Sequence, residues 1–120
     1  MDLSLSSTAL STSFAAIVGA VLTRRRRARG INQTVLARVV GLNQAGWSKI
    51  ERGTISLSLE HLSLVAPELG VSPGVVLDEA ERVVRHVEAL GVQVVRRRLE
   101  AGGVDVAQVQ AWVEAVLAPD

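Results

Sequence analysis

The chain has 120 residues, of which 48 % are hydrophobic, and this is enough for one compact core but too little for two large independent domains. Cysteine is absent, which excludes disulfides, thiolate metal sites and cysteine nucleophiles. The formal net charge is only +1, so total charge alone points to no particular partner.

The N-terminal part divides into an arm and a helix. Residues 1–12 are rich in serine and threonine and lack regular apolar spacing, so we expect a flexible arm there. Apolar residues then recur at helical spacing as far as Leu22, and Gly30 is a natural stop. This pattern predicts a helix over residues 13–28.

Two short helices are predicted next, each followed by a glycine. Asn32 is a suitable N-cap for a helix over residues 33–40, and Asn43 is a suitable N-cap for a helix that continues through Arg52. Two short helices joined by about three residues with a glycine in the turn have the geometry of a helix-turn-helix.

A fourth helix is predicted from Leu59 and a fifth over residues 73–90. Pro67 lies inside the fourth helix, where it removes a backbone donor, so we expect a kink or an early end near Ala66. Ser72 precedes a proline that suits the first position of the fifth helix.

The C-terminal part is less regular in pattern. Residues 92–99 are β-branched at several positions and fit either a short strand or a continued helix. After the glycines at 102 and 103, Asp105 is a suitable N-cap for a last helix with a broad apolar face.

Charge is strongly segregated along the chain. Residues 14–53 carry eight basic residues and one acidic residue, a net charge of +7, whereas residues 78–120 carry five arginines and eight acidic residues, a net charge of −3. A basic segment joined to an acidic one is typical of a nucleic-acid reader with a separate part that does not touch nucleic acid.

Neither a membrane span nor a secretory signal is indicated. The apolar stretch Phe14–Leu22 is far shorter than the roughly 20 residues that a span requires. Its arginines follow the apolar run, whereas a secretory signal has its positive charge before that run. We therefore expect a cytoplasmic protein without membrane contact.

The ordered motifs between Val18 and Leu77 resemble the Cro/CI-type helix-turn-helix family, also called the XRE family, which includes phage repressors, restriction-modification controllers and many antitoxins. The matching residues are Arg26, Gly30-Ile31-Asn32-Gln33, Leu36-Ala37, Gly41-Leu42-Asn43-Gln44, Ser48-Lys49-Ile50-Glu51-Arg52-Gly53 and Leu69-Gly70-Val71-Ser72. The resemblance implies an all-α, five-helix, lambda-repressor-like domain over residues 13–77, which reads double-stranded DNA through its third helix.

The resemblance also implies roles for individual positions. Four side chains occupy the positions that face base edges in the major groove: Gln44, Ala45, Ser48 and Lys49. Lys49 is the only lysine in a chain with twelve arginines, which favours a specific role. Phosphate contacts are expected from Gln33 and Asn43, and from the basic residues Arg25, Arg29 and Arg52.

Arg26 is expected to have a structural role instead. It follows Leu22 by one turn and Val18 by two turns on the buried face of the first helix, where an unpaired charge would be very costly. Glu51 is the only acidic residue in the basic segment, and the family pairs the corresponding arginine and glutamate. We therefore predict an internal ion pair between Arg26 and Glu51. Trp47 is expected to be a large core residue, with direct contact with DNA as the alternative.

The acidic segment, residues 78–120, is expected to form a homodimer through the apolar face of its last helix, because that face offers more apolar surface than one small domain needs to cover it. The residues of this face are Val109, Trp112, Val113 and Val116. The alternative is that the helix folds back on the rest of its own chain.

These features favour a sequence-specific DNA-binding regulator, most simply a homodimeric repressor of an inverted-repeat operator that acts on its own promoter. Antitoxins and protein-interaction modules share the fold and are the alternatives. An enzyme is not expected, since His61 and His86 lie on different predicted helices and no phosphate loop or metal-spaced cluster occurs. We expect no cofactor, no metal and no small-molecule effector.

Overall fold

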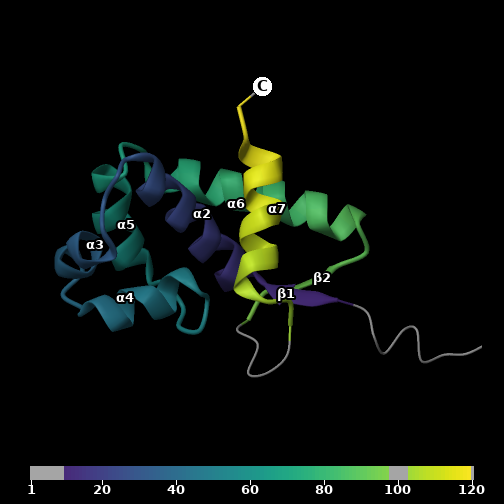
Figure 1. The fold of residues 1–120 in the computed structure, drawn as a ribbon, viewed down its shortest axis with the longest axis horizontal. Coiled ribbons are helices and arrows are strands. Elements are labelled where there is room, and N and C mark those ends of the chain that lie inside the picture. The colour runs from purple at the N-terminus through teal and green to yellow at the C-terminus, as the bar shows by residue number, and fades with distance from the viewer. Residues whose placement is uncertain (1–9, 98–102, 120) are drawn as a thin grey trace, which may run out of the picture.

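A computed structural model describes residues 10–97 and 103–119 (Figure 1). In chain order, its elements are β1 (Ser11–Ser13), α2 (Phe14–Ala28), α3 (Gln33–Val39), α4 (Gln44–Glu51), α5 (Leu59–Glu68), α6 (Pro73–Ala89), β2 (Gln93–Val95) and α7 (Val106–Leu117). The described residues therefore form a largely helical fold with one pair of short strands, and the predicted helix-turn-helix corresponds to α3 and α4.

Side-chain caps fix where most of the helices begin. Five residues accept a hydrogen bond from the backbone N–H three positions later: Ser13, Asn43, Ser58, Ser72 and Asp105. Asn32 occupies the N-cap position of α3 but makes no such side-chain bond, contrary to the prediction. Pro67 lies in the last turn of α5, which ends one residue later, so the helix ends two residues beyond the expected position.

Helix α2 is the central element of the fold. Its residues Ile17, Val21 and Leu22 are fully buried, because α4, α6 and α7 all pack against it. Figure 1 shows α7, in yellow, crossing in front of α2 and α6. The helix-turn-helix and the C-terminal segment are therefore joined through one shared core.

The strands β1 and β2 pair in parallel, with Ser11 opposite Gln93 and Ser13 opposite Val95. The N–H of Val104 also donates to the carbonyl oxygen of Ser11, at 2.7 Å. The prediction of a flexible arm is therefore wrong for residues 11 and 12, because they pair with Gln93 and Val94 much later in the chain. Residues 92–99 were expected to form either a short strand or a continued helix, and the structure has a strand at 93–95. Residues 98 and 99 lie outside the described residues.

Helix α7 folds back on its own chain, which was the alternative to dimerisation. Val109 and Val113 are 1 % and 0 % exposed in the common core with α2 and α6, so the structure contradicts their prediction as dimer contacts. Trp112 and Val116 are partly buried and pack against the same core. The apolar face of α7 is thus used to cover α2 and α6.

Gly19 permits close contact between α2 and the end of α4. A Cβ atom at this position would lie 2.6 Å from the carbonyl oxygen of Ile50 and closer still to that of Glu51. We expect Gly19→Ala to lower the free energy of unfolding by about 1–3 kcal/mol, because the backbone of α4 would have to shift. Urea unfolding followed by circular dichroism measures this change.

The matched control is Gly74→Ala, which also adds one methyl group to a helical glycine. Its Cβ would meet only the Ser72 hydroxyl oxygen, at 3.8 Å, so stability should be unchanged or slightly higher. Equal effects of the two substitutions would contradict the proposed steric role of Gly19.

Candidate nucleic-acid interface

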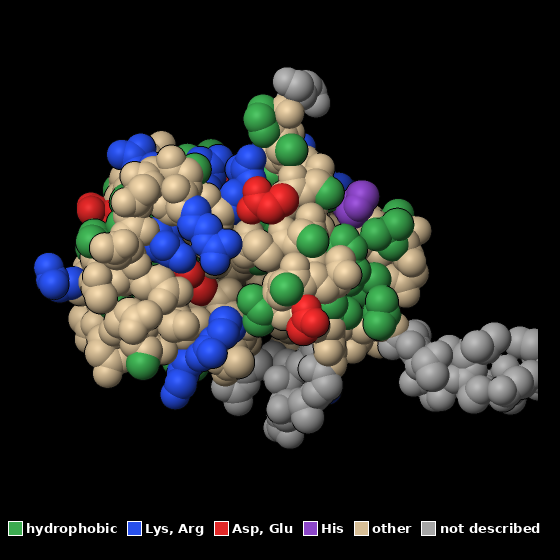
Figure 2. Space-filling view, in the orientation of Figure 1, with side chains coloured by type: hydrophobic (Ala, Val, Ile, Leu, Met, Phe, Trp, Pro, Cys, Tyr) green, Lys and Arg blue, Asp and Glu red, His purple; other side chains and the backbone are tan. Residues whose placement is uncertain are grey.

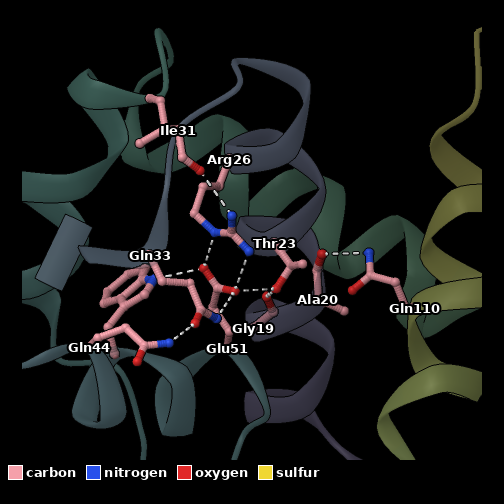
Figure 3. Close-up of polar contacts among 10 residues, drawn as sticks. Gly19, Ala20, Thr23, Arg26, Ile31, Gln33, Gln44, Glu51 and Gln110 are labelled. Carbon is pink, nitrogen blue, oxygen red and sulfur yellow. Dashed lines mark hydrogen bonds and ion pairs between the residues drawn. The ribbon is translucent and has the colours of Figure 1, made fainter. Parts of the chain in front are cut away.

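The predicted ion pair between Arg26 and Glu51 is present and buried (Figure 3). The Nε atom of Arg26 donates to Oε2 of Glu51 at 2.7 Å, and Nη2 donates to Oε1 at 3.0 Å. Nη1 donates to the carbonyl oxygen of Ile31 at 2.9 Å, in the loop before α3. One guanidinium group therefore joins α2 to both helices of the helix-turn-helix.

Three further side chains donate hydrogen bonds to the same carboxylate. They are the Trp47 indole at 2.6 Å, the Gln33 amide at 2.8 Å and the Thr23 hydroxyl at 3.0 Å. Sequence reasoning treated Trp47 only as a core residue, which its full burial supports, and missed its hydrogen bond. The signal was its spacing of four residues from Glu51 on one helix face.

These donors determine the ionisation of Glu51. Burial raises the pKa of this carboxyl group, but the hydrogen bonds from Arg26, Gln33 and Trp47 and the charge of Arg26 lower it more strongly, so the pKa lies below its ordinary value. Glu51 is therefore a stably charged acceptor, and each donor around it must point a hydrogen towards it.

The charged acceptor fixes the orientation of two glutamine amides. Gln33 donates its Nε2 hydrogen to Glu51, and its Oε1 accepts from Nε2 of Gln44 at 2.7 Å. Gln44 then has an amide hydrogen and its Oε1 left for a partner. That pair of one donor and one acceptor matches the major-groove edge of adenine.

The predicted base-reading residues share one exposed side of α4. Gln44, Ala45 and Lys49 are exposed and Ser48 is partly exposed. Asn43 is also exposed, but its Oδ1 accepts from the N–H of Gly46 at 2.8 Å as the helix cap. Arg52, just after α4, is exposed and makes no hydrogen bond or ion pair within the described residues.

The other predicted phosphate contacts are placed differently by the fold. Arg25 forms a two-point ion pair with Glu79 on α6, at 2.7 and 2.8 Å, so its guanidinium is occupied within the protein, contrary to the prediction. Arg29 is exposed, and its guanidinium lies beside Gly70 in the turn after α5.

Arg27, the last arginine of the run on α2, differs from Arg25 in its contacts. It is exposed, makes no hydrogen bond or ion pair within the described residues, and lines a hollow of about 480 Å³ together with Asn32, Gln33, Thr34 and Gln44. Its place directly after Arg26 on α2 was the available signal. Figure 2 shows Lys and Arg side chains gathered on the α3 and α4 side of this face, whereas α7 presents mainly apolar and acidic side chains.

Comparisons with known proteins agree with this geometry. A sequence profile for a helix-turn-helix family matches residues 22–76. The chain is similar to the clp gene regulator ClgR from Corynebacterium glutamicum, with 30 % identity and a TM-score of 0.60 over 64 % of this chain and 82 % of that one. A second ClgR crystal structure gives 32 % identity and a TM-score of 0.53 over 57 % and 88 % of the two chains.

No curated protein sequence matches the chain significantly. The family profile and the ClgR structures nevertheless place it: the chain belongs to the XRE-type helix-turn-helix family of DNA-binding transcriptional regulators. Within the described residues, no helix is long and apolar enough to cross a membrane, and no three potential metal-binding side chains cluster together.

Replacement of Glu51 by glutamine tests the buried ion pair. Because Glu51→Gln leaves Arg26 without its counter-charge, we expect a loss of about 3–5 kcal/mol in the free energy of unfolding at pH 7. The folded-state pKa of Glu51 is lowered, so its contribution is complete above the ordinary value of about 4.3 and is lost as the pH falls towards the folded pKa.

The difference between the wild type and Glu51→Gln should therefore narrow as the pH is lowered below about 4.3. Urea unfolding of both proteins between neutral and acidic pH measures it. A difference that stays constant down to pH 3 would show that ionisation of Glu51 does not stabilise the fold.

Proposed function

We propose that this protein is a repressor that reads an inverted-repeat operator as a homodimer, with α4 in the major groove. The observation that carries the proposal is the chain of hydrogen bonds from Glu51 through Gln33 to Gln44, because it prepares a base-reading amide before DNA arrives. Repression would follow from occupation of a promoter, including its own.

The exposed residues of α4 divide into reading and positioning roles. Gln44 reads adenine through its free donor and acceptor, Lys49 reads guanine, and the methyl group of Ala45 meets a thymine methyl, with Ser48 as a further polar contact. Arg27 and Arg52 lie beside Ser48, and neither guanidinium makes a hydrogen bond or ion pair within the described residues. Both contact phosphates of the DNA backbone.

A dimer surface other than the predicted face of α7 is needed, because the residues predicted for that role are buried in the core or pack against it. Leu59 and Ile55, which follow α4, are 81 % and 37 % exposed. Leu59 stands beside an apolar hollow of about 200 Å³, lined also by Phe14, Leu57 and Leu77. A projecting side chain beside a hollow suits a two-fold interface, in which Leu59 of each copy enters the hollow of the other.

The DNA-reading roles predict different effects of two substitutions. Lys49→Ala should cost about 1–3 kcal/mol at the preferred site and relax the preference at one base pair. Arg27→Ala should weaken binding to all duplexes alike and reduce the slope of log K against log salt by about 0.9. Fluorescence anisotropy with duplexes selected from a random pool measures both effects.

Arg25→Ala is the matched control for Arg27→Ala, since it removes a neighbouring arginine that is already paired with Glu79. It should leave the salt dependence of DNA binding unchanged. Absence of any selected sequence, or binding without salt dependence, would reject DNA reading and favour an antitoxin or protein-interaction role for the fold.

The dimer surface predicts that Leu59→Glu converts the protein to a monomer at micromolar concentration. The reason is that a carboxylate would have to be buried in the apolar hollow of the partner. Leu64→Glu is the control, because Leu64 is 46 % exposed on α5 and does not line the hollow. Sedimentation equilibrium measures the state, and a wild-type monomer, or a Leu59→Glu dimer, would reject the surface.

A further inference from the structure

A third hollow, of about 680 Å³, lies between the helix-turn-helix and α7. Arg27, Ser48 and Arg52 line its side towards α2 and α4. Its opposite wall is one face of α7, formed by Val106, Ala107, Gln110, Ala111 and Glu114. The volume is within the range of about 300–1,000 Å³ that is typical of sites for small molecules. We call this hollow the α4–α7 groove.

The two walls of the α4–α7 groove differ in chemistry. The wall on α2 and α4 carries two exposed guanidinium groups, of Arg27 and Arg52, with no hydrogen bond or ion pair within the described residues. The α7 wall contributes the side chains of Val106, Ala107 and Ala111, which are exposed and apolar.

Most of the remaining polar groups of the groove are already engaged within the protein. Gln110 uses its Nε2 to donate to the carbonyl oxygen of Ala20 (Figure 3). The same Nε2 donates to Glu114, and Glu114 also pairs with Arg24. Thr23 and Glu51 hydrogen-bond to each other at 3.0 Å. Among the described residues, the groups of the groove that remain free are therefore two cations and the Ser48 hydroxyl, which face a largely apolar helix surface.

We propose that the α4–α7 groove binds a small amphipathic anion. Its carboxylate, sulfonate or phosphate group pairs with Arg27 and Arg52, and its hydrocarbon or aromatic body lies against Ala107 and Ala111. DNA does not suit both walls, because a phosphodiester backbone gains nothing from the apolar side and α7 offers it no cationic side chain. This proposal departs from the expectation, based on the sequence, that the protein has no small-molecule effector.

The position of the site implies competition with DNA, a consequence that rests on the proposed function. Arg27 and Arg52 are the proposed phosphate contacts, so an anion that occupies them removes two charges from the DNA-binding surface. By thermodynamic linkage, the ligand lowers the affinity for DNA and DNA lowers the affinity for the ligand by the same factor. A ligand of this class therefore acts as an inducer.

The test uses two probes of this chemical class with the full-length protein and no DNA. Anilinonaphthalene sulfonate reports binding by fluorescence, and decanoate should displace it, whereas decanol, which lacks the charge, should displace it poorly. Saturable binding with one site per chain is expected. No saturable binding of either anion by the wild type overturns the proposal.

Substitutions on α7 locate the site. Ala111→Trp fills the groove and should abolish probe binding, whereas Ala115→Trp adds the same side chain to an exposed position outside the groove and should not. Circular dichroism shows that both variants are folded. Equal probe affinity in the two variants overturns the proposal.

Substitution of the cations provides a second test that does not depend on filling the groove. Arg27→Ala with Arg52→Ala should weaken binding of decanoate roughly ten-fold, because both cationic partners of the carboxylate are lost, although each is exposed and contributes little by itself. Unchanged decanoate affinity overturns the charged half of the site.

The competition with DNA is measured separately. Decanoate should lower DNA affinity of the wild type but not of Ala111→Trp, and an unchanged wild-type affinity rejects the competition. Failure of the protein to bind any selected DNA without probe would reject the proposed function alone.

Discussion

The fold of the DNA-reading part depends on a single buried carboxylate. Glu51 is 4 % exposed, and a charge in that position requires a complete set of donors, which Arg26, Gln33, Trp47 and Thr23 provide from three helices. The carboxylate therefore holds α2, α3 and α4 together. Its hydrogen bonds can all form only when those three helices are correctly placed. Through Gln33, the same carboxylate also fixes the orientation of the exposed Gln44 amide.

The fold determines which of the arginines on α2 are neutralised by an acidic partner. The arginine run of α2 has the same side chain at each position, yet Arg24 pairs with Glu114 on α7, Arg25 with Glu79 on α6, and Arg26 with Glu51. The acidic C-terminal segment therefore neutralises part of the basic surface. Arg27 makes no hydrogen bond or ion pair within the described residues. It lines both the hollow beside α3 and the α4–α7 groove.

Local signals in the sequence predicted most of the helices and one long-range contact. The N-caps at Asn43, Ser72 and Asp105 act through residues three positions away, so they are visible in sequence. The ion pair of Arg26 could be predicted as well, because helical spacing requires its burial and the basic segment holds one acidic residue. The DNA-contacting positions of α4 followed from the family resemblance, and they remain predictions about a complex.

The sequence by itself therefore determined most of the helices, the caps at Asn43, Ser72 and Asp105, the helix-turn-helix family and the internal ion pair. All of these depend on neighbouring residues or on a unique partner. Tertiary structure alone decided the pairing of β1 with β2, the position of α7 and which arginines of α2 form ion pairs within the protein. An apolar helix face has the same periodicity whether it covers its own chain or a second copy. A strand of three residues acquires its partner only from the packed helices that bring Ser11 and Gln93 together.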